Sequence, residues 1–305
     1  MQINKISHSN ELLEHIHIHH KHLSVKIFPK LGGSVQELMV NGTRIIDGIS
    51  IDESGLIDYQ NSYKSAVLFP FPNRVKDGTY RYNETTFQLG INEKSLNNAL
   101  HGLVFDKTFE ITRSELFEER AKLELTYKSD GKLPGFPFRF ELKLIYRISF
   151  KGGLSLTLKI KNTDTCTFPY GLGWHPYFYT NDLASALISI PAQDFYSSDK
   201  RGLPLEPVPA DIPPEFELDD KNFDDAFSLK NPRCDLKTDS YDVSLGFKYP
   251  EGTYLQVYTP PHRKNIAIEP MTCLANSFNN KIGFSELAPK KSDTWRINLF
   301  NITKS

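Results

Sequence analysis

Hydrophobic residues recur at every second position along much of this chain of 305 residues. In the clearest run, residues 139–147, Phe140, Leu142, Leu144 and Tyr146 alternate with charged side chains. The same alternation covers residues 23–27, 122–128, 154–160, 255–257, 266–268 and 295–299. Because successive side chains of a β-strand point to opposite faces of the sheet, each run predicts a strand with one buried face.

Sequences that favour tight turns separate these runs, as at Asn41-Gly42, Asp77-Gly78 and Asp130-Gly131. Long stretches with helical periodicity are nearly absent. Residues 115–121 could be read as a short helix, but strand alternation follows at once. Many strands with few helices are typical of a sandwich or a barrel.

Five prolines between residues 203 and 214 interrupt the pattern. Proline lacks the N–H that a sheet ladder needs, so this segment is a linker or a long surface loop. We favour the loop, because strands of the same kind resume after it. The chain is therefore expected to be all-β and to form a single domain over residues 1–305, a large twisted antiparallel β-sandwich, since so many strands would overfill a small barrel.

Composition excludes several classes of function. With 36 basic and 37 acidic residues the net charge is -1, which provides no global field for nucleic acid or an anionic membrane. The amino-terminal residues are polar, and no run reaches the length of about 18 apolar residues that a membrane span needs. Three cysteines without CxxC spacing argue against a zinc knuckle and favour free thiols, although one disulfide stays open. We expect a cytoplasmic monomer or homodimer.

Two polar segments fall outside the strand pattern and are therefore expected to be loops, where functional residues concentrate. Residues 68–75 contain two prolines before Asn73 and Arg74, and such an arginine can present its planar fork of donors to a ligand oxygen. Pairing with a structural carboxylate is the more common role for an arginine. His101 precedes Gly102, which permits close backbone approach, but a lone histidine is more often structural.

The segment 170–178 combines two glycines, four aromatic residues and His175. Aromatic side chains such as Tyr177 suit the apolar C–H faces of a sugar, and a histidine among them can exchange a proton near neutral pH. Core packing explains some of the aromatic residues but not the histidine together with both glycines, so a functional role is favoured.

Two acidic positions complete the candidates. Glu269 ends an apolar run, where partial desolvation would raise its pKa above about 4.3 and make it a useful base. A water-exposed glutamate at a strand end is the equal alternative. Asp224 and Asp225 lie together between phenylalanines; one of them could accept hydrogen bonds from a ligand, but a turn is the simpler interpretation.

Residues 14–22 contain five histidines. His15, His17 and His19 would project from one face of a strand, where zinc could bind them. A polar strand face with adventitious metal affinity is the better interpretation, and no dedicated metal site or cofactor is predicted.

Taken together and in order, these segments resemble the aldose 1-epimerase (galactose mutarotase) family. The resemblance spans nearly the whole chain. Each motif is short, but five in the same order are specific. They are Pro72-Asn73-Arg74, Leu100-His101-Gly102, His175-Pro176-Tyr177-Phe178, Phe223-Asp224-Asp225-Ala226-Phe227 and Ile268-Glu269.

The resemblance implies a galactose mutarotase-like supersandwich and conversion between the α and β anomers of a free sugar, without a cofactor. In the family roles, Glu269 is the general base that takes the proton of the anomeric hydroxyl, and His175 is the general acid that protonates the ring oxygen. The sugar-binding residues would be Arg74, His101, Asp224, Asn73 and Tyr177.

The sequence departs from the family pattern at Leu103, Tyr179 and Met271, so the preferred sugar stays open. Three alternatives also stay open: a non-catalytic carbohydrate-binding protein, a hexose-phosphate mutarotase, and a lyase or glycosidase on the same fold. A phosphorylated sugar would require further cations near Arg74, such as Lys76. A glycosidase would require two carboxylates that flank the scissile bond.

Overall fold

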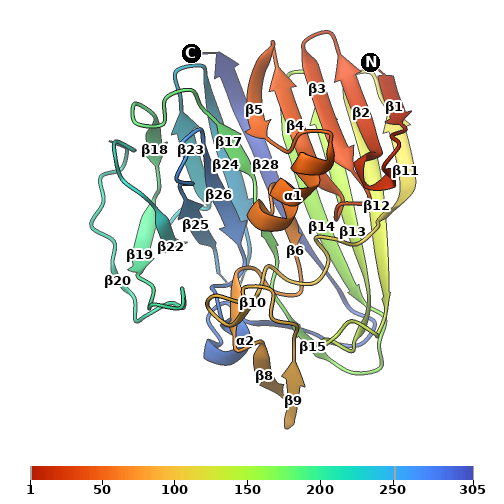
Figure 1. Ribbon diagram of the computed structural model, residues 1–305, viewed down its shortest axis with the longest axis vertical. Coiled ribbons are helices and arrows are strands. Elements are labelled where there is room, and N and C mark those ends of the chain that lie inside the picture. The colour runs from red at the N-terminus through yellow and green to blue at the C-terminus, as the bar shows by residue number, and fades with distance from the viewer. Residues whose placement is uncertain (1, 251, 305) are drawn as a thin grey trace.

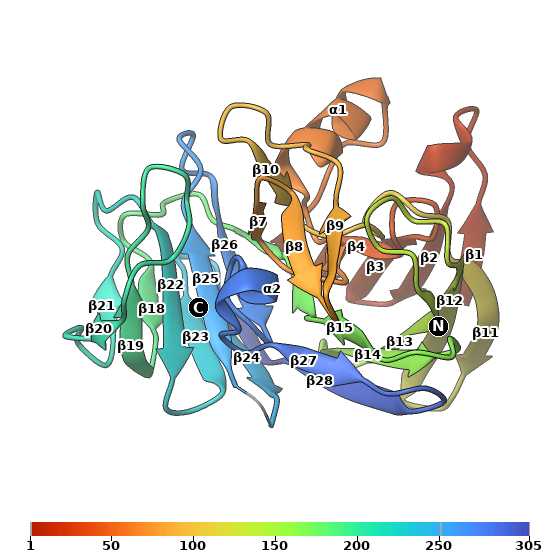
Figure 2. The same ribbon diagram turned by 90° about the horizontal axis from the view of Figure 1, so that it is seen from below.

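Two large antiparallel sheets pack face to face in the computed structural model, which describes residues 2–250 and 252–304 (Figures 1 and 2). The predicted all-β class and the β-sandwich are confirmed. All strand pairs among these residues are antiparallel. Helix α1 and the loops around it cover the face of one sheet that points away from the other sheet (Figure 2).

The sheet that carries α1 is called the front sheet below. Its main path is β1 (Gln2–Ile6), β2 (His15–His20), β3 (Leu23–Phe28), β4 (Ser34–Val40), β5 (Thr43–Asp47), β17 (Tyr177–Tyr179), β26 (Asn265–Met271), β25 (Tyr254–Tyr258), β22 (Asp224–Leu229), β19 (Ala192–Tyr196) and β20 (Val208–Pro209). Two short strands lie off this path, β16 (Gly173–Trp174), which pairs with β26, and β6 (Val67–Leu68), which pairs with β16.

The back sheet forms the second layer. Its strands, in spatial order, are β11 (Glu110–Leu116), β12 (Arg120–Asp130), β13 (Arg139–Ser149), β14 (Leu154–Asn162), β28 (Ser292–Lys304), β24 (Tyr241–Lys248), β23 (Arg233–Lys237), β18 (Leu187–Ser189) and β21 (Phe216–Glu217). Three small ribbons pair β7 (Arg74–Lys76) with β10 (Asn98–Leu100), β8 (Thr79–Tyr82) with β9 (Thr85–Gln88), and β15 (Phe168–Tyr170) with β27 (Ser285–Leu287).

Strand alternation in the sequence becomes burial alternation in the structure. Along β13, every second residue from Phe140 to Ile148 is buried and the residues between them are partly exposed. Ile16 and Ile18 of β2 and Leu23, Val25 and Ile27 of β3 belong to the same hydrophobic core. The core therefore fills the space between the two sheets, as sandwich packing requires.

Helix α1 (Glu53–Ser62) was not predicted, and it is the main departure from expectation. The side chain of Asp52 accepts a hydrogen bond from the backbone N–H of Gly55 and so caps the helix. The two remaining helical segments are short, η1 (Glu11–Leu13) and α2 (Ser277–Asn280). None of the helices in the described part of the chain has the length and apolar character that a membrane crossing requires.

Other expectations have clear outcomes. Residues 115–121 are not helical, because they contain the end of β11 and the start of β12. The proline-rich segment 203–214 is irregular apart from the two-residue strand β20. The histidine-rich segment forms β2, with His15 buried and His17 and His19 partly exposed. All three cysteines are unpaired.

Leu158→Ala tests how much the back sheet contributes to stability. Leu158 is fully buried on β14 between Leu144 of β13 and Trp295 of β28. We expect the free energy of unfolding, measured by urea denaturation, to fall by about 2–5 kcal/mol, because the truncation leaves a cavity. Lys159→Ala, which alters the exposed neighbour on the other face, should change it by no more than about 0.5 kcal/mol. Equal losses in the two variants would contradict the observed sheet orientation.

Candidate active site

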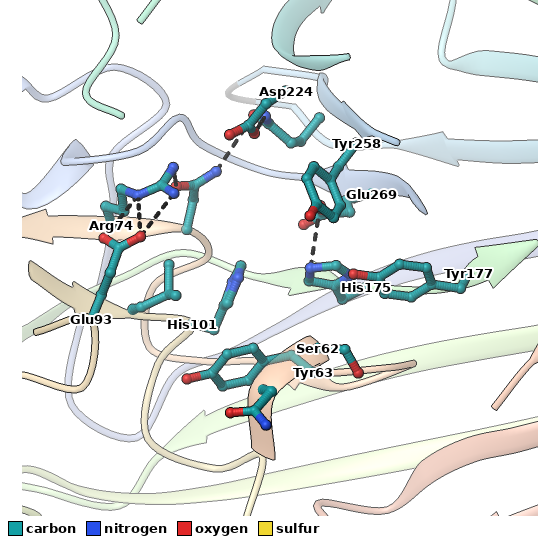
Figure 3. A pocket seen from close by; sticks show the side chains of 14 residues that line it. Ser62, Tyr63, Arg74, Glu93, His101, His175, Tyr177, Asp224, Tyr258 and Glu269 are labelled. Atoms are coloured by element: carbon teal, nitrogen blue, oxygen red, sulfur yellow. Dashed lines mark hydrogen bonds and ion pairs between the residues drawn. The ribbon is translucent and has the colours of Figure 1, made fainter. Parts of the chain in front are cut away.

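A pocket of about 280 Å³ lies on the outer face of the front sheet, beside α1. It draws residues from segments that are far apart in the chain, and Figure 3 shows their side chains. Its lining consists of Asn61, Ser62, Tyr63, Asn73, Arg74, Glu93, Leu100, His101, His175, Tyr177, Asp224, Gln256, Tyr258 and Glu269. All seven residues that the sequence selected for the site are among them.

Glu269 lies on β26, a strand on which every residue is buried. Only 2% of Glu269 is exposed, and its Oε2 has no hydrogen-bond partner. Burial raises the pKa of this carboxyl well above its usual value, and the nearby carboxylate of Asp224 raises it further, while Arg74 opposes the shift. The exposed strand-end alternative is therefore wrong, and Glu269 has the environment of a strong base.

The sheet register places His175 beside Glu269. β16 pairs through Gly173 with one end of β26, and β17 pairs through Tyr177 with the other end. His175 lies midway between these two pairs, directly across from Glu269. Cross-strand neighbours share one face of the sheet, so the two side chains meet, and Nε2 of His175 lies 3.3 Å from Oε1 of Glu269 (Figure 3).

His175 is held from both sides. Its backbone N–H donates to the carbonyl of Ala66 at 3.0 Å, and its own carbonyl accepts from the N–H of Ser65 at 2.7 Å. The imidazole stacks on the ring of Tyr177 with centroids 5.1 Å apart. Burial lowers the pKa of His175 to about 3, because a charged imidazolium is poorly solvated there. Its Nδ1 has no partner.

The opposite pKa shifts of Glu269 and His175 have one chemical consequence. Burial disfavours both the carboxylate and the imidazolium, so the two shifts together favour a state in which the pair holds one proton between its two members. That proton can lie on the carboxyl or on the imidazole without any change in the total charge of the site. Such a pair can take a proton at one atom and deliver one at another.

His101 and Asn73 form one corner of the pocket. Both have left-handed backbones, with φ of 61° and 55°, and the N–H of His101 donates to the carbonyl of Asn73 at 2.9 Å. The following Gly102 has φ of 77°, and a Cβ there would lie 2.4 Å from the carbonyl oxygen of Phe69. The His101 ring meets that of His175 edge to face, with centroids 4.9 Å apart, and its Nδ1 has no partner. Burial lowers the pKa of His101 well below its usual value.

Arg74 forms an ion pair with Glu93, and both residues line the pocket. Nε of Arg74 lies 2.9 Å from Oε2 of Glu93, and Nη2 lies 2.9 Å from Oε1. The Nδ2 of Asn98 donates to the same carboxylate at 2.8 Å. The structural ion pair that the sequence left open for Arg74 is therefore present, although the guanidinium also lines the pocket.

Asp224 belongs to a short chain of hydrogen bonds. Nε2 of Gln256 donates to Oδ1 of Asp224 at 2.8 Å, and Oε1 of Gln256 accepts from Nδ2 of Asn73 at 3.4 Å. Gln256 lies opposite Glu269 in the β25–β26 pair. Of the two neighbouring aspartates, Asp224 lines the pocket and Asp225 does not.

Six polar lining residues were not predicted from the sequence: Asn61, Ser62, Tyr63, Glu93, Gln256 and Tyr258. Gln256 and Tyr258 occupy alternate positions of β25 on the face that carries Glu269. Their spacing of two residues along a predicted strand could therefore have indicated that they share one face. Tyr63 has a left-handed backbone at the end of α1, and Glu93 lies in a loop. Neither of these two belongs to a motif.

One set of lining residues has the composition of a metal site. His101, His175 and Glu269 each offer a ligand atom, and these atoms lie within 4.8 Å of one another. Among the described residues no other group of three or more histidines, cysteines and carboxylates is arranged in this way.

Comparison with known proteins finds a matching family, a related sequence and similar structures. The sequence profile of the aldose 1-epimerase family matches residues 14–299. The uncharacterized protein YihR of Escherichia coli strain K12 is 28% identical over 290 residues, which cover 90% of this chain and 89% of that protein. A galactose mutarotase-like protein from Clostridium acetobutylicum superposes with a TM-score of 0.89 at 24% identity, covering 100% of this chain and 99% of that chain. Galactose 1-epimerase from Lactobacillus acidophilus NCFM superposes with a TM-score of 0.80 at 16% identity. The superposition covers 100% of this chain and 98% of that chain.

Glu269→Gln should stabilise the protein as the pH rises. Because the folded-state pKa of Glu269 is raised, the folded chain binds more protons than the unfolded chain above about pH 4.3, so this residue costs stability increasingly as pH rises toward the folded pKa. We expect the difference in unfolding free energy between Glu269→Gln and wild type to grow from pH 4 to pH 8 in urea denaturation. Exposed Glu217→Gln is the control and should show no such growth. If the unfolding free energies of all three proteins changed with pH in parallel, the destabilising burial of the Glu269 carboxylate would be contradicted.

Proposed function

The chain belongs to the aldose 1-epimerase family, and we propose that it interconverts the α and β anomers of a free aldose by acid–base ring opening. The observation that carries this proposal is the contact between two buried groups with opposite pKa shifts, Glu269 and His175, 3.3 Å apart in the pocket. The reaction needs no cofactor, because it changes no oxidation state.

In the proposed reaction the shared proton lies on His175, so that Glu269, as the carboxylate, takes the proton of the anomeric hydroxyl while His175 gives its proton to the ring oxygen. The C1–O bond of the ring breaks, an aldehyde forms, and rotation about C1–C2 turns the other face of the carbonyl toward the ring hydroxyl. Closure reverses both transfers. Both oxygens are bonded to the same carbon, so a base and an acid that touch each other can reach them together. Each group is expected to contribute roughly 10²–10⁴-fold.

The pocket also offers what a sugar ring needs for binding. Nδ1 of His101, Nδ1 of His175 and Oε2 of Glu269 are buried without partners, and sugar hydroxyls can both donate to and accept from such atoms. Tyr63, Tyr177 and Tyr258 line the same cavity and can contact the apolar C–H faces of the ring. Asn73, Arg74 and Asp224 add polar groups at the rim, and we assign to them the binding of hydroxyls.

Charge favours an unphosphorylated substrate over a hexose phosphate. Arg74 is the single lysine or arginine in the lining, and Glu93 already neutralises it. The lining also includes Asp224 and Glu269. A phosphate dianion would lose its hydration without gaining a free cation. The three unpaired cysteines are consistent with the reducing cytoplasm as the place of this reaction.

Polarimetry on freshly dissolved α-glucose and α-galactose tests the assignment. We expect wild type to speed the approach to anomeric equilibrium, and Glu269→Gln and His175→Asn to lower kcat by about 10²–10⁴-fold, since each removes one proton-transfer group. Asp225→Asn, beside the pocket but outside its lining, is the matched control and should retain activity.

The substrate panel separates the alternatives. A non-catalytic binding protein would show saturable sugar binding without faster mutarotation. A hexose-phosphate mutarotase would act on glucose 6-phosphate but not on glucose, and a glycosidase would act only on linked sugars. Any of these three results would overturn the proposal.

The pH dependence of kcat/KM is a second test. An ordinary histidine acid would give an acid limb near pH 6.5. Burial lowers the pKa of His175 to about 3, so the one-proton form of the pair persists into mild acid. We expect kcat/KM, corrected for the uncatalysed rate, to stay level between about pH 5 and pH 7. A steep decline that begins near pH 6.5 would show that the buried pair does not set the protonation state of the active enzyme.

A further inference from the structure

We propose that the pocket is also a binding site for one divalent transition-metal ion, with Zn²⁺ as the best match, held by His101, His175 and Glu269. The ion would compete with the sugar and so act as a reversible inhibitor. This inference goes beyond the proposed function, and only its inhibitory consequence rests on that function.

The geometry of the three side chains is close to that of a zinc site. Their ligand atoms lie within 4.8 Å of one another, and all three residues are buried. Tetrahedral zinc with bonds of about 2.0–2.1 Å separates its ligand atoms by about 3.3 Å. His175 Nε2 and Glu269 Oε1 are already 3.3 Å apart. A decrease of about 1.5 Å in the separation of the widest pair would complete the arrangement.

The unsatisfied atoms of the pocket strengthen this inference. Nδ1 of His101, Nδ1 of His175 and Oε2 of Glu269 are buried and have no hydrogen-bond partner within the described residues. Nδ1 of His101 and Oε2 of Glu269 are therefore free to donate a lone pair without breaking an existing bond, and His175 can bind through Nε2, the ring nitrogen that faces Glu269. Three protein ligands leave a fourth position for water, which is the arrangement of zinc sites that are open to small molecules.

Charge in the pocket is suited to a dication. Glu93 neutralises Arg74, and neither Asp224 nor Glu269 has a lysine or arginine partner in the described residues. Two imidazoles favour Zn²⁺ and its transition-metal neighbours over Mg²⁺ and Ca²⁺, which prefer oxygen ligands. The site is therefore expected to discriminate between these classes.

A bound ion would block catalysis directly. It would occupy the carboxylate that serves as the base and the imidazole that serves as the acid, and it would lie where the sugar hydroxyls bind. Zinc inhibition should consequently raise the apparent KM for the sugar and leave kcat unchanged at saturating sugar. Zinc bound elsewhere on the surface would not show this pattern.

The histidines of β2 require a control. His17 and His19 have ring centroids 5.1 Å apart on one strand face and could hold zinc by themselves. Zinc binding is therefore measured in the His17→Asn/His19→Asn background, with EDTA-treated protein, ZnCl₂ and a competing chromophoric chelator. In this background we expect one Zn²⁺ per chain and no binding of Mg²⁺.

Two pocket variants make the test specific. His101→Asn keeps a residue that tolerates the left-handed backbone at this position, and Glu269→Gln removes the carboxylate without changing its size. Each should lower the zinc affinity by more than about tenfold. No zinc binding in the His17→Asn/His19→Asn background, or unchanged affinity in both pocket variants, would overturn the site. Because chelator competition does not depend on activity, it remains decisive even if mutarotation is absent.

Discussion

The carboxylate of Glu269 is buried in the middle of a strand that has no exposed residue, and the chemistry of the pocket depends on this constraint. β26 contributes Ile266 and Ile268 to the sandwich core on one face, and Glu269 on its other face lines the pocket. Burial of a charged group is costly unless a partner compensates it. Here the partner is a histidine that is buried equally well, so one proton can satisfy both groups.

Glu269 and His175 meet at a place where the regular strand pairing next to β26 is interrupted. β16 and β17 would be one strand next to β26, but His175 and Pro176 separate them. Pro176 still accepts from the N–H of Ile268, while the backbone of His175 turns to Ser65 and Ala66. The histidine thereby keeps its place across from Glu269 and gains fixed contacts on a second segment. A regular strand would have placed the side chain on the correct face without anchoring it in the pocket.

The strands could be predicted from alternation alone, because one face of each is buried in the core. The site could be selected only by the order of its motifs, since nothing in the spacing of His101, His175 and Glu269 indicates that their strands meet. α1 and Glu93 were missed for a different reason. The helix carries no clear apolar stripe, and Glu93 acts through a long-range pair with Arg74. This pair is the structural role that is more common for an arginine, although the guanidinium still lines the pocket.

The unpaired atoms of the pocket indicate what its ligand must supply. A buried polar atom without a partner lowers stability, and Nδ1 of His101, Nδ1 of His175 and Oε2 of Glu269 are three such atoms in one cavity. A ligand that pairs with all three atoms at once removes this loss of stability. A ring with several hydroxyl groups can do so by hydrogen bonds, and a zinc ion would bind the same three residues by accepting lone pairs. Because both would bind the same residues, selectivity between them depends on His101. A sugar needs only one hydrogen bond from this residue, whereas a metal ion needs it as a ligand.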